Sequence, residues 1–174
     1  YTYALNRWGK EFVEEFGIGF AYDAWDGLIN YAKQQLLSSE VLIQLGLIAH
    51  SEKSKKDYDF FRARIMIPIR DRYNRIIGYT ARTMADDDKT PKYLNSSNSL
   101  IYQKSQSVFG IDIAARAAVK DGVYVLVEGA PDVLRLQSIG ILNAVASLGS
   151  DWTDEQFKVL QRNATKLIFM PDAD

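Results

Sequence analysis

The chain has 174 residues, of which 47% are hydrophobic and 25% are charged. This length supports one domain or two small ones, and the composition argues against disorder. The absence of cysteine excludes a disulfide scaffold, a cysteine-ligated zinc site and a cysteine nucleophile, while a single histidine argues against a multi-histidine metal site. There is no signal-peptide pattern and no apolar run of the roughly 20 residues that a membrane span needs, so we expect a cytoplasmic protein without a membrane partner.

The net charge of −1 conceals an uneven distribution along the chain. Residues 53–104 contain twelve Lys or Arg against six Asp, a net charge of +6, whereas the remaining residues carry −7. A basic segment between acidic flanks indicates a surface that meets a polyanion. A solvated sheet surface with chance clustering of charge remains the alternative interpretation.

Residues 1–57 are predicted to form a helical N-terminal part. Asp23 can cap a first helix, and Ser38 or Ser39 can begin a second helix that Gly46 ends. The first helix carries an apolar stripe at helical spacing, formed by Trp25, Leu28, Ile29, Ala32 and Leu36. We expect this stripe, and the three tryptophans of the chain, to serve in packing rather than in chemistry.

Residues 58–104 are predicted to form a basic subdomain built on a β-hairpin. The segment FFRARIMIPI alternates between two faces, RDRYNR has turn character, and RIIGYTART reads as a second strand. Pro68 suits a strand end or a sheet edge, because it cannot donate a ladder hydrogen bond. The polar stretch that follows, ADDDKTPKYLNSSNS, combines basic, hydroxyl and aromatic side chains that suit contacts with phosphate and sugar.

Residues 105–174 alternate between helix and strand patterns. The apolar runs VYVLV, NAVAS and KLIFM are predicted to be strands, the first with the pattern of a buried parallel strand, and Thr153 and Gln156 have the capping-box spacing at the start of a helix. Strands separated by helices predict a parallel α/β layer. The predicted fold class is therefore α/β, with an α+β N-terminal subdomain followed by this layer.

Acidic residues follow two of the predicted strands. Glu128 comes directly after VYVLV, whereas Asp172 and Asp174 come after KLIFM. Because ligands bind beyond the carboxyl ends of parallel strands, we expect these acids to meet if the two strands are neighbours, and Asp132 to join them. Carboxylates without His or Cys favour Mg²⁺ or Mn²⁺, ions that can stabilise the charge of phosphoryl transfer. Helix-entry acids beside a solvated turn are the alternative.

Several segments together resemble a known family. EGAPD (128–132), ASLGS (146–150) and DAD (172–174) resemble the TOPRIM module that primases and topoisomerases share. The rest of the chain resembles, in collinear order, the catalytic core of DnaG-type bacterial DNA primases through FGIGFAYDAWD (16–26), RIMIPIRDRYNRIIGYTAR (64–82), PKYLNS (91–96) and YQK (102–104). The resemblance implies that residues 105–174 form a partial, truncated TOPRIM domain.

The resemblance implies a nucleotidyltransferase that makes short RNA primers on single-stranded DNA from ribonucleoside triphosphates. It implies Glu128 and Asp132 as catalytic acids and a Mg²⁺ or Mn²⁺ site at Glu128, Asp172 and Asp174, with no zinc in this part of the protein. A replicative helicase is the implied partner, through regions that this sequence does not contain. The implied nucleic-acid and nucleotide contacts are Arg64, Arg82, Lys92, Asn95 and Lys104.

The chain departs from the family pattern at several positions. Ala130 and Pro131 stand where the family usually has an aromatic and an apolar residue, and Ser105 and Gln106 replace a glycine and a basic residue. The first residue is not Met, and the family has a further strand and further acids after the DAD segment, so we expect a piece of a longer protein with little or no primer synthesis by itself. A non-catalytic module that binds single-stranded DNA, and a topoisomerase or nuclease with the same acidic fold, are the other functions considered.

Overall fold

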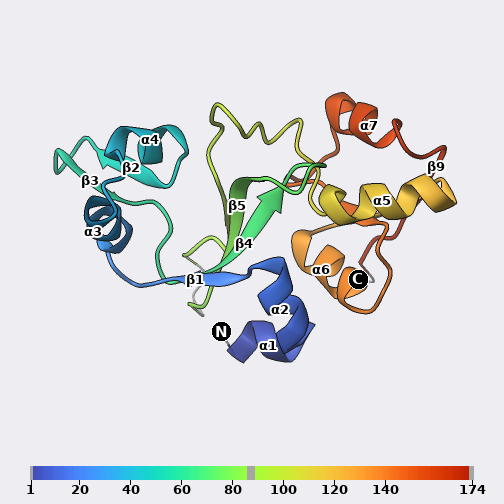
Figure 1. Cartoon of the computed structure of the whole chain (residues 1–174), viewed down its shortest axis with the longest axis horizontal. Helices are drawn as coiled ribbons and strands as arrows, with labels where there is room; N and C mark the ends of the chain where they lie inside the picture. The colour runs from blue at the N-terminus through green and yellow to red at the C-terminus, as the bar shows by residue number, and fades with distance from the viewer. Residues whose placement is uncertain (1, 86–88, 173–174) are drawn as a thin grey trace.

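The computed structural model describes residues 2–85 and 89–172, and it combines helices with three separate sheets. Figure 1 shows a small helical unit at one end, an antiparallel sheet in the middle and a parallel α/β layer at the other end. The mixed α/β class predicted from the sequence is therefore confirmed. No helix in the described part of the chain has the length and apolar character needed to cross a bilayer.

The described residues up to 57 contain the two predicted helices, α3 (Gly27–Gln34) and α4 (Ser39–Gln44), and in addition the helices α1 (Thr2–Trp8) and α2 (Lys10–Phe16) and short strands. The strands are β1 (Gly19–Ala21), β2 (Ile48–Ser51) and the start of β3 (Lys56–Asp59). β2 and β3 pair as an antiparallel ribbon beside α3 and α4. The prediction of a helical segment is thus incomplete, because short strands of three or four residues give too little periodic signal to be read from sequence.

The first turn of α3 is capped from a distant strand. Asp26, and not the predicted Asp23, precedes the helix, and its side chain makes no capping hydrogen bond. Instead, the buried carboxylate of Asp59 accepts hydrogen bonds from the backbone N–H groups of Leu28 (2.7 Å) and Ile29 (3.2 Å). These bonds satisfy donors that the start of a helix leaves unpaired, so β3 fixes the position of α3.

The predicted hairpin forms the centre of a four-stranded antiparallel sheet. Its strands are β4 (Arg64–Arg70) and β5 (Ile76–Thr83), and the sheet has the order β1-β4-β5-β6, with β6 spanning Tyr93–Asn95. Asp71 closes the turn by accepting hydrogen bonds from the N–H groups of Tyr73 and Arg75. β1 pairs with β4 only up to Met66, so Pro68 lies on an edge where no donor is required, as predicted.

The C-terminal part is a parallel α/β layer with the strand order β8-β7-β9. Its strands are β7 (Val123–Val127), β8 (Ala144–Ala146) and β9 (Lys166–Phe169), and its helices are α5 (Ile111–Asp121), α6 (Ala130–Ser138) and α7 (Asp154–Leu160). The predicted capping box is present at α7, where Thr153 Oγ1 accepts from Gln156 N and Gln156 Oε1 accepts from Thr153 N. The layer predicted from the helix and strand patterns is confirmed.

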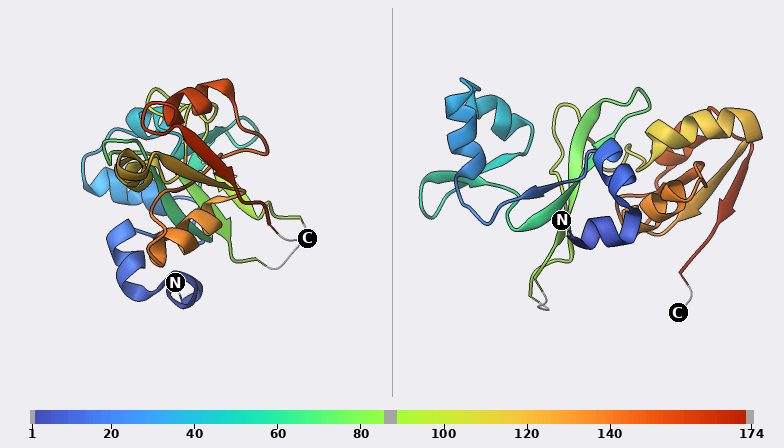
Figure 2. Two further views of the ribbon diagram at one scale, coloured as in Figure 1. Left: turned by 90° about the vertical axis from the view of Figure 1, so that its right-hand side faces the viewer. Right: turned by 60° about the horizontal axis from the view of Figure 1, so that its bottom comes forward.

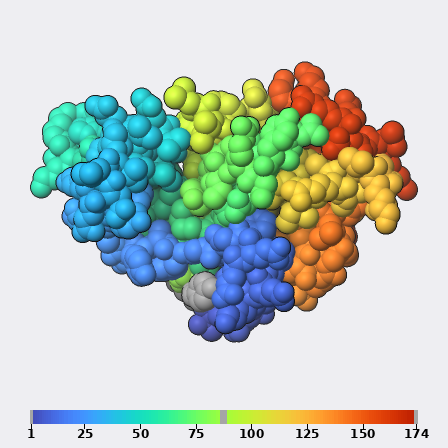
Figure 3. Space-filling view, viewed as in Figure 1, coloured from blue at the N-terminus to red at the C-terminus, as the bar shows by residue number. Residues whose placement is uncertain are grey.

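One hydrophobic core joins the central sheet to the parallel layer. It includes Trp8 of α1, Phe16 of α2, Ile67 of β4 and Val133 of α6. Figure 2 and Figure 3 show α1 and α2 lying against both the central sheet and α6. Of the tryptophans predicted to pack, Trp8 is buried in this core, whereas Trp25 is 65% exposed and packs against Tyr58 at the surface.

Candidate active site

The acids after β7 and β9 meet at one edge of the parallel sheet. β7 and β9 are hydrogen-bonded neighbours, with Leu126 opposite Phe169. Glu128 therefore emerges beside the segment that follows β9, and the backbone N–H of Asp172 donates to Oε1 of Glu128 at 3.1 Å. The sequence predicted that these acids would meet if the two strands were neighbours, and Glu128 and Asp172 do lie side by side. Both residues are exposed.

Asp132 lies close to this pair, in the first turn of α6. Its Oδ2 accepts a hydrogen bond from the N–H of Gly129 at 3.1 Å, which ties it to the residue directly after Glu128. Burial, and then the negative charge of Asp172, raise the pKa of the Asp132 carboxyl above its usual range, while the positive charge of Arg7 acts in the opposite direction. The negative charges of Asp132 and Asp172 therefore lie close together, and the positive charge of Arg7 offsets them only in part.

The predicted metal ligand Asp174 lies outside the described residues. Within residues 2–85 and 89–172, no group of three or more His, Cys, Asp or Glu side chains is arranged to hold a metal ion. The acids that do meet there offer hard oxygen ligands only, and the mutual repulsion between Asp132 and Asp172 would be relieved by a cation. Oxygen donors of this kind suit a hard divalent cation such as Mg²⁺ or Mn²⁺ better than zinc.

Two of the predicted nucleic-acid contacts lie beside the acidic edge. Nδ2 of Asn95 donates to the carbonyl oxygen of Leu148 at 2.8 Å, and a Cβ on Gly149 would lie 3.7 Å from Nζ of Lys104. These loop residues follow β8, whose last residue pairs with Val127 of β7. The loop therefore leaves the sheet at the same edge as Glu128, and Lys104 of the basic segment lies against it.

Arg64 and Arg82, both predicted contacts for nucleic acid or nucleotide, lie on opposite faces of the central sheet. Arg82 is the cross-strand partner of Ile65, one residue after Arg64, and successive side chains of a strand point to opposite faces. Arg64 is buried and donates to the carbonyl oxygens of Ala81 and Pro91. Burial and then the charge of Arg62 lower its pKa. The geometry gives Arg64 a role in holding the segment after β5 in place.

Arg82 belongs to a cluster of aromatic and basic side chains on the other face. Its guanidinium carbon lies 4.2 Å above the centre of the Tyr3 ring, and Tyr93 of β6 is its cross-strand partner. Burial raises the pKa of the Tyr93 hydroxyl, against the opposing charges of Arg82 and Arg7. The side chain of Lys92, the remaining predicted contact, is exposed, and its carbonyl oxygen accepts from Thr83 N.

Sequence reasoning missed Arg7, which connects the two charged regions. This arginine acts electrostatically on Tyr93 of the central sheet and on Asp132 of the acidic edge. Tyr3 and Arg7 are four residues apart on α1, so they lie on one face of the helix. The spacing of Tyr3 and Arg7 could be seen in the sequence. Only the packing of α1 in the structure shows which residues Arg7 faces.

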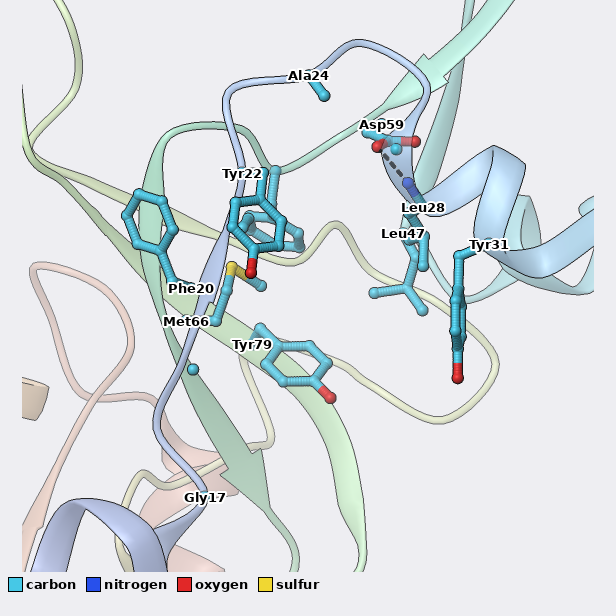
Figure 4. A pocket seen from close by; sticks show the side chains of 14 residues that line it. Gly17, Phe20, Tyr22, Ala24, Leu28, Tyr31, Leu47, Asp59, Met66 and Tyr79 are labelled. Atoms are coloured by element: carbon cyan, nitrogen blue, oxygen red, sulfur yellow. Dashed lines mark hydrogen bonds between the residues drawn. The ribbon is translucent and has the colours of Figure 1, made fainter. Parts of the chain in front are cut away.

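An apolar hollow of about 540 Å³ lies between the central sheet and α3 (Figure 4). Its walls include Phe20, Tyr22, Met66 and Tyr79, and none of the predicted site residues lines it. The carboxylate at its rim, Asp59, is already bonded to the start of α3. The hollow offers no group for phosphoryl chemistry, which leaves the acidic edge as the candidate active site.

Comparison with known families first gives the class of the parallel layer. Residues 125–174 match the family described as Toprim-like. Residues 2–115 match the family described as DNA primase catalytic core, N-terminal domain. The chain therefore belongs to the DNA primase catalytic-core family. This membership implies the use of a divalent metal ion.

Individual relatives agree with this family. The chain is 39% identical to the DNA primase of Halalkalibacterium halodurans over 174 residues, covering 99% of this chain and 29% of the relative, and 36% identical to that of Deinococcus radiodurans over 165 residues, covering 94% and 28%. The RNA polymerase domain of Mycobacterium tuberculosis primase DnaG superposes with a TM-score of 0.90 at 32% identity, covering 99% of this chain and 58% of that one.

A DnaG primase catalytic domain solved with single-stranded DNA superposes with a TM-score of 0.84 at 34% identity, covering 99% of this chain and 54% of that one. The chain thus spans less than a third of the length of the curated primases named above, and little more than half of the two solved domains. The curated relatives and the solved structures named here are all primases.

Proposed function

We propose that this chain is part of the catalytic core of a DNA primase, which makes short RNA primers on a single-stranded DNA template from ribonucleoside triphosphates. The observation that carries the proposal is the meeting of Glu128 with Asp172 at the sheet edge that Asn95 and Lys104 also approach. A polyanion lying along the basic side chains would present its phosphates to the carboxylates. A replicative helicase partner and a cytoplasmic location belong to the same proposal.

Each residue has a defined part in this proposal. Glu128, Asp132 and Asp172 would hold Mg²⁺ or Mn²⁺. When bound, such an ion stabilises the negative charge that develops on the triphosphate during nucleotidyl transfer. Arg82, Lys92 and Lys104 bind phosphate groups of the template or of the nucleotide, and Asn95 holds the loop after β8 in place through Leu148.

Substitution of Glu128, the proposed metal ligand at the end of β7, provides the direct test. Glu128→Gln keeps the size of an exposed side chain and an oxygen that can accept from Asp172 N, but it removes the charge. In the full-length protein that contains this chain, the variant is expected to lose primer synthesis with an unchanged melting temperature. Glu155→Gln on α7 is the matched control, because Glu155 is exposed and its ion pair with Lys158 lies on the surface. Primer synthesis at the wild-type rate in Glu128→Gln would refute the proposal.

A non-catalytic module that binds single-stranded DNA is the second candidate. It is favoured by the buried Ala130 and by Pro131, which stand beside the acids where the family usually has larger side chains. This candidate predicts salt-sensitive DNA binding that is the same in EDTA and in Mg²⁺, together with an inactive full-length protein. Catalysis predicts Mg²⁺-dependent or Mn²⁺-dependent primer synthesis, with little or none by the 174-residue chain alone.

A further inference from the structure

We infer that Tyr3 is a positioning residue for Arg82: its ring fixes the plane in which the Arg82 guanidinium meets a phosphate of the nucleic acid or nucleotide. The inference rests on the proposed function, because it assumes that Arg82 binds phosphate. It assigns a role to α1, whose sequence suggested packing only. Tyr3 itself touches no substrate in this role and acts through Arg82.

The contacts of Arg82 show why its orientation depends on Tyr3. Nη1 donates to the carbonyl oxygen of the adjacent Thr83 at 3.2 Å and contacts the sulfur of Met84 at 3.9 Å. Nε is buried and has no hydrogen-bond partner among the described residues. Thr83 and Met84 are the next two residues of the chain, so these two contacts do not tie the guanidinium to another element. The Tyr3 ring, 4.2 Å below the guanidinium carbon, supplies the flat surface against which it lies.

This stacking matters because phosphate binding by arginine depends on direction. A guanidinium binds two phosphate oxygens through parallel N–H groups in one plane, so rotation of that plane breaks the second bond. Stacking on an aromatic face holds the plane without using any N–H donor. Tyr3 approaches Arg82 from α1, a different element from β5, which carries Arg82.

The position of Tyr3 also gives it a packing role that the test must separate. Its ring makes an edge contact with buried Trp8 at 6.1 Å and packs against the core that joins α1 to the sheet. Tyr3→Leu keeps an apolar side chain in that core and removes the aromatic face. Tyr3→Phe keeps the face and removes only the hydroxyl, so it is the conservative variant expected to retain function.

The experiment measures the affinity of the purified protein for a labelled single-stranded DNA oligomer between about 50 and 200 mM salt, where the logarithmic slope reports phosphate contacts. Tyr3→Leu is expected to weaken binding by about 3- to 10-fold and to lower the slope by about 1, as Arg82→Ala does. Tyr3→Phe is expected to match the wild type. Tyr73→Leu is the control, because Tyr73 also lies under an arginine, Arg75, but on the exposed hairpin turn.

A double variant tests whether Tyr3 acts through Arg82. In the Arg82→Ala background, Tyr3→Leu is expected to change neither affinity nor slope any further. The positioning role alone is overturned if Arg82→Ala weakens binding while Tyr3→Leu only lowers the melting temperature, or if Tyr3→Leu keeps its full effect without Arg82. Unchanged binding in Arg82→Ala would instead overturn the phosphate contact on which both this inference and that part of the proposed function depend.

Discussion

The side-chain amide of Asn95 donates to the carbonyl oxygen of Leu148 over 2.8 Å and so connects two residues that are 53 positions apart. The bond joins β6 of the antiparallel sheet to the loop that leaves the parallel sheet beside Glu128. It is a direct polar link between the basic subdomain and the edge that carries the acids. The relative position of template and carboxylates would depend on it.

Removal of this link should weaken both the fold and the proposed activity. Asn95→Ala is expected to lower the free energy of unfolding by about 0.5–1.5 kcal/mol, the net value of one hydrogen bond, as measured in urea. Asn143→Ala is the control, because Nδ2 of Asn143 donates to Val123 at 3.1 Å, at the start of β7 and away from the acids. Primer synthesis should fall in Asn95→Ala and not in Asn143→Ala, so equal activity in both would contradict the role given to Asn95.

The capping of α3 by a residue on β3 makes a second prediction. Asp59→Ala removes the acceptor of two backbone N–H groups and is expected to destabilise the protein by about 1–2 kcal/mol in chemical denaturation. Asp26→Ala should have little effect, because Asp26 precedes α3 in sequence but makes no capping bond. A larger loss of stability in Asp26→Ala than in Asp59→Ala would show that the cap is local after all.

Asp112 predicts a dependence of stability on pH. Burial raises the pKa of this carboxyl above its ordinary value of 3.8, although N–H groups of α5 and the charges of Arg70 and Arg116 act against the shift. The folded protein therefore holds this proton at pH values where the unfolded chain has lost it, and the stability that this gives declines as pH rises above about 4 through the folded pKa.

The variant Asp112→Asn should remove this contribution. Its free energy of unfolding, relative to the wild type, is expected to increase from pH 3 to pH 7, in a series of denaturation curves. Asp121→Asn, at the exposed end of the same helix, serves as the control and should follow the wild-type profile. A constant difference between Asp112→Asn and the wild type across this range would contradict the raised pKa.

The acidic edge predicts that Mg²⁺ stabilises the folded chain. An ion that binds only the folded state raises the unfolding free energy by about 2.7 kcal/mol at 100 times its dissociation constant. Addition of Mg²⁺ should therefore raise the melting temperature, and EDTA should reverse the change. Asp172→Asn should reduce the response, whereas Glu155→Gln should retain it. An equal rise in melting temperature in both variants would show that Mg²⁺ binds at another site.

Local patterns in the sequence determined much of the architecture. The hairpin of residues 64–83, the capping box at Thr153 and the strands before Glu128 and Asp172 all follow from periodicity and turn chemistry within a few residues. The fold class could therefore be predicted without coordinates, and the resemblance to a family came separately, from sequence motifs such as EGAPD and PKYLNS. The convergence of acids was also accessible, but only as a condition on which strands are neighbours.

Tertiary structure decided the features that depend on pairing between distant segments. Strand register put Arg64 and Arg82 on opposite faces, since each residue along a strand reverses the side-chain direction. The docking of α1 brought Tyr3 to Arg82 and Arg7 toward Asp132, and the packing of β3 beside α3 made Asp59 its cap. These relationships join residues tens of positions apart, and no local periodicity encodes them, because they arise from how whole elements bury their apolar faces against one another.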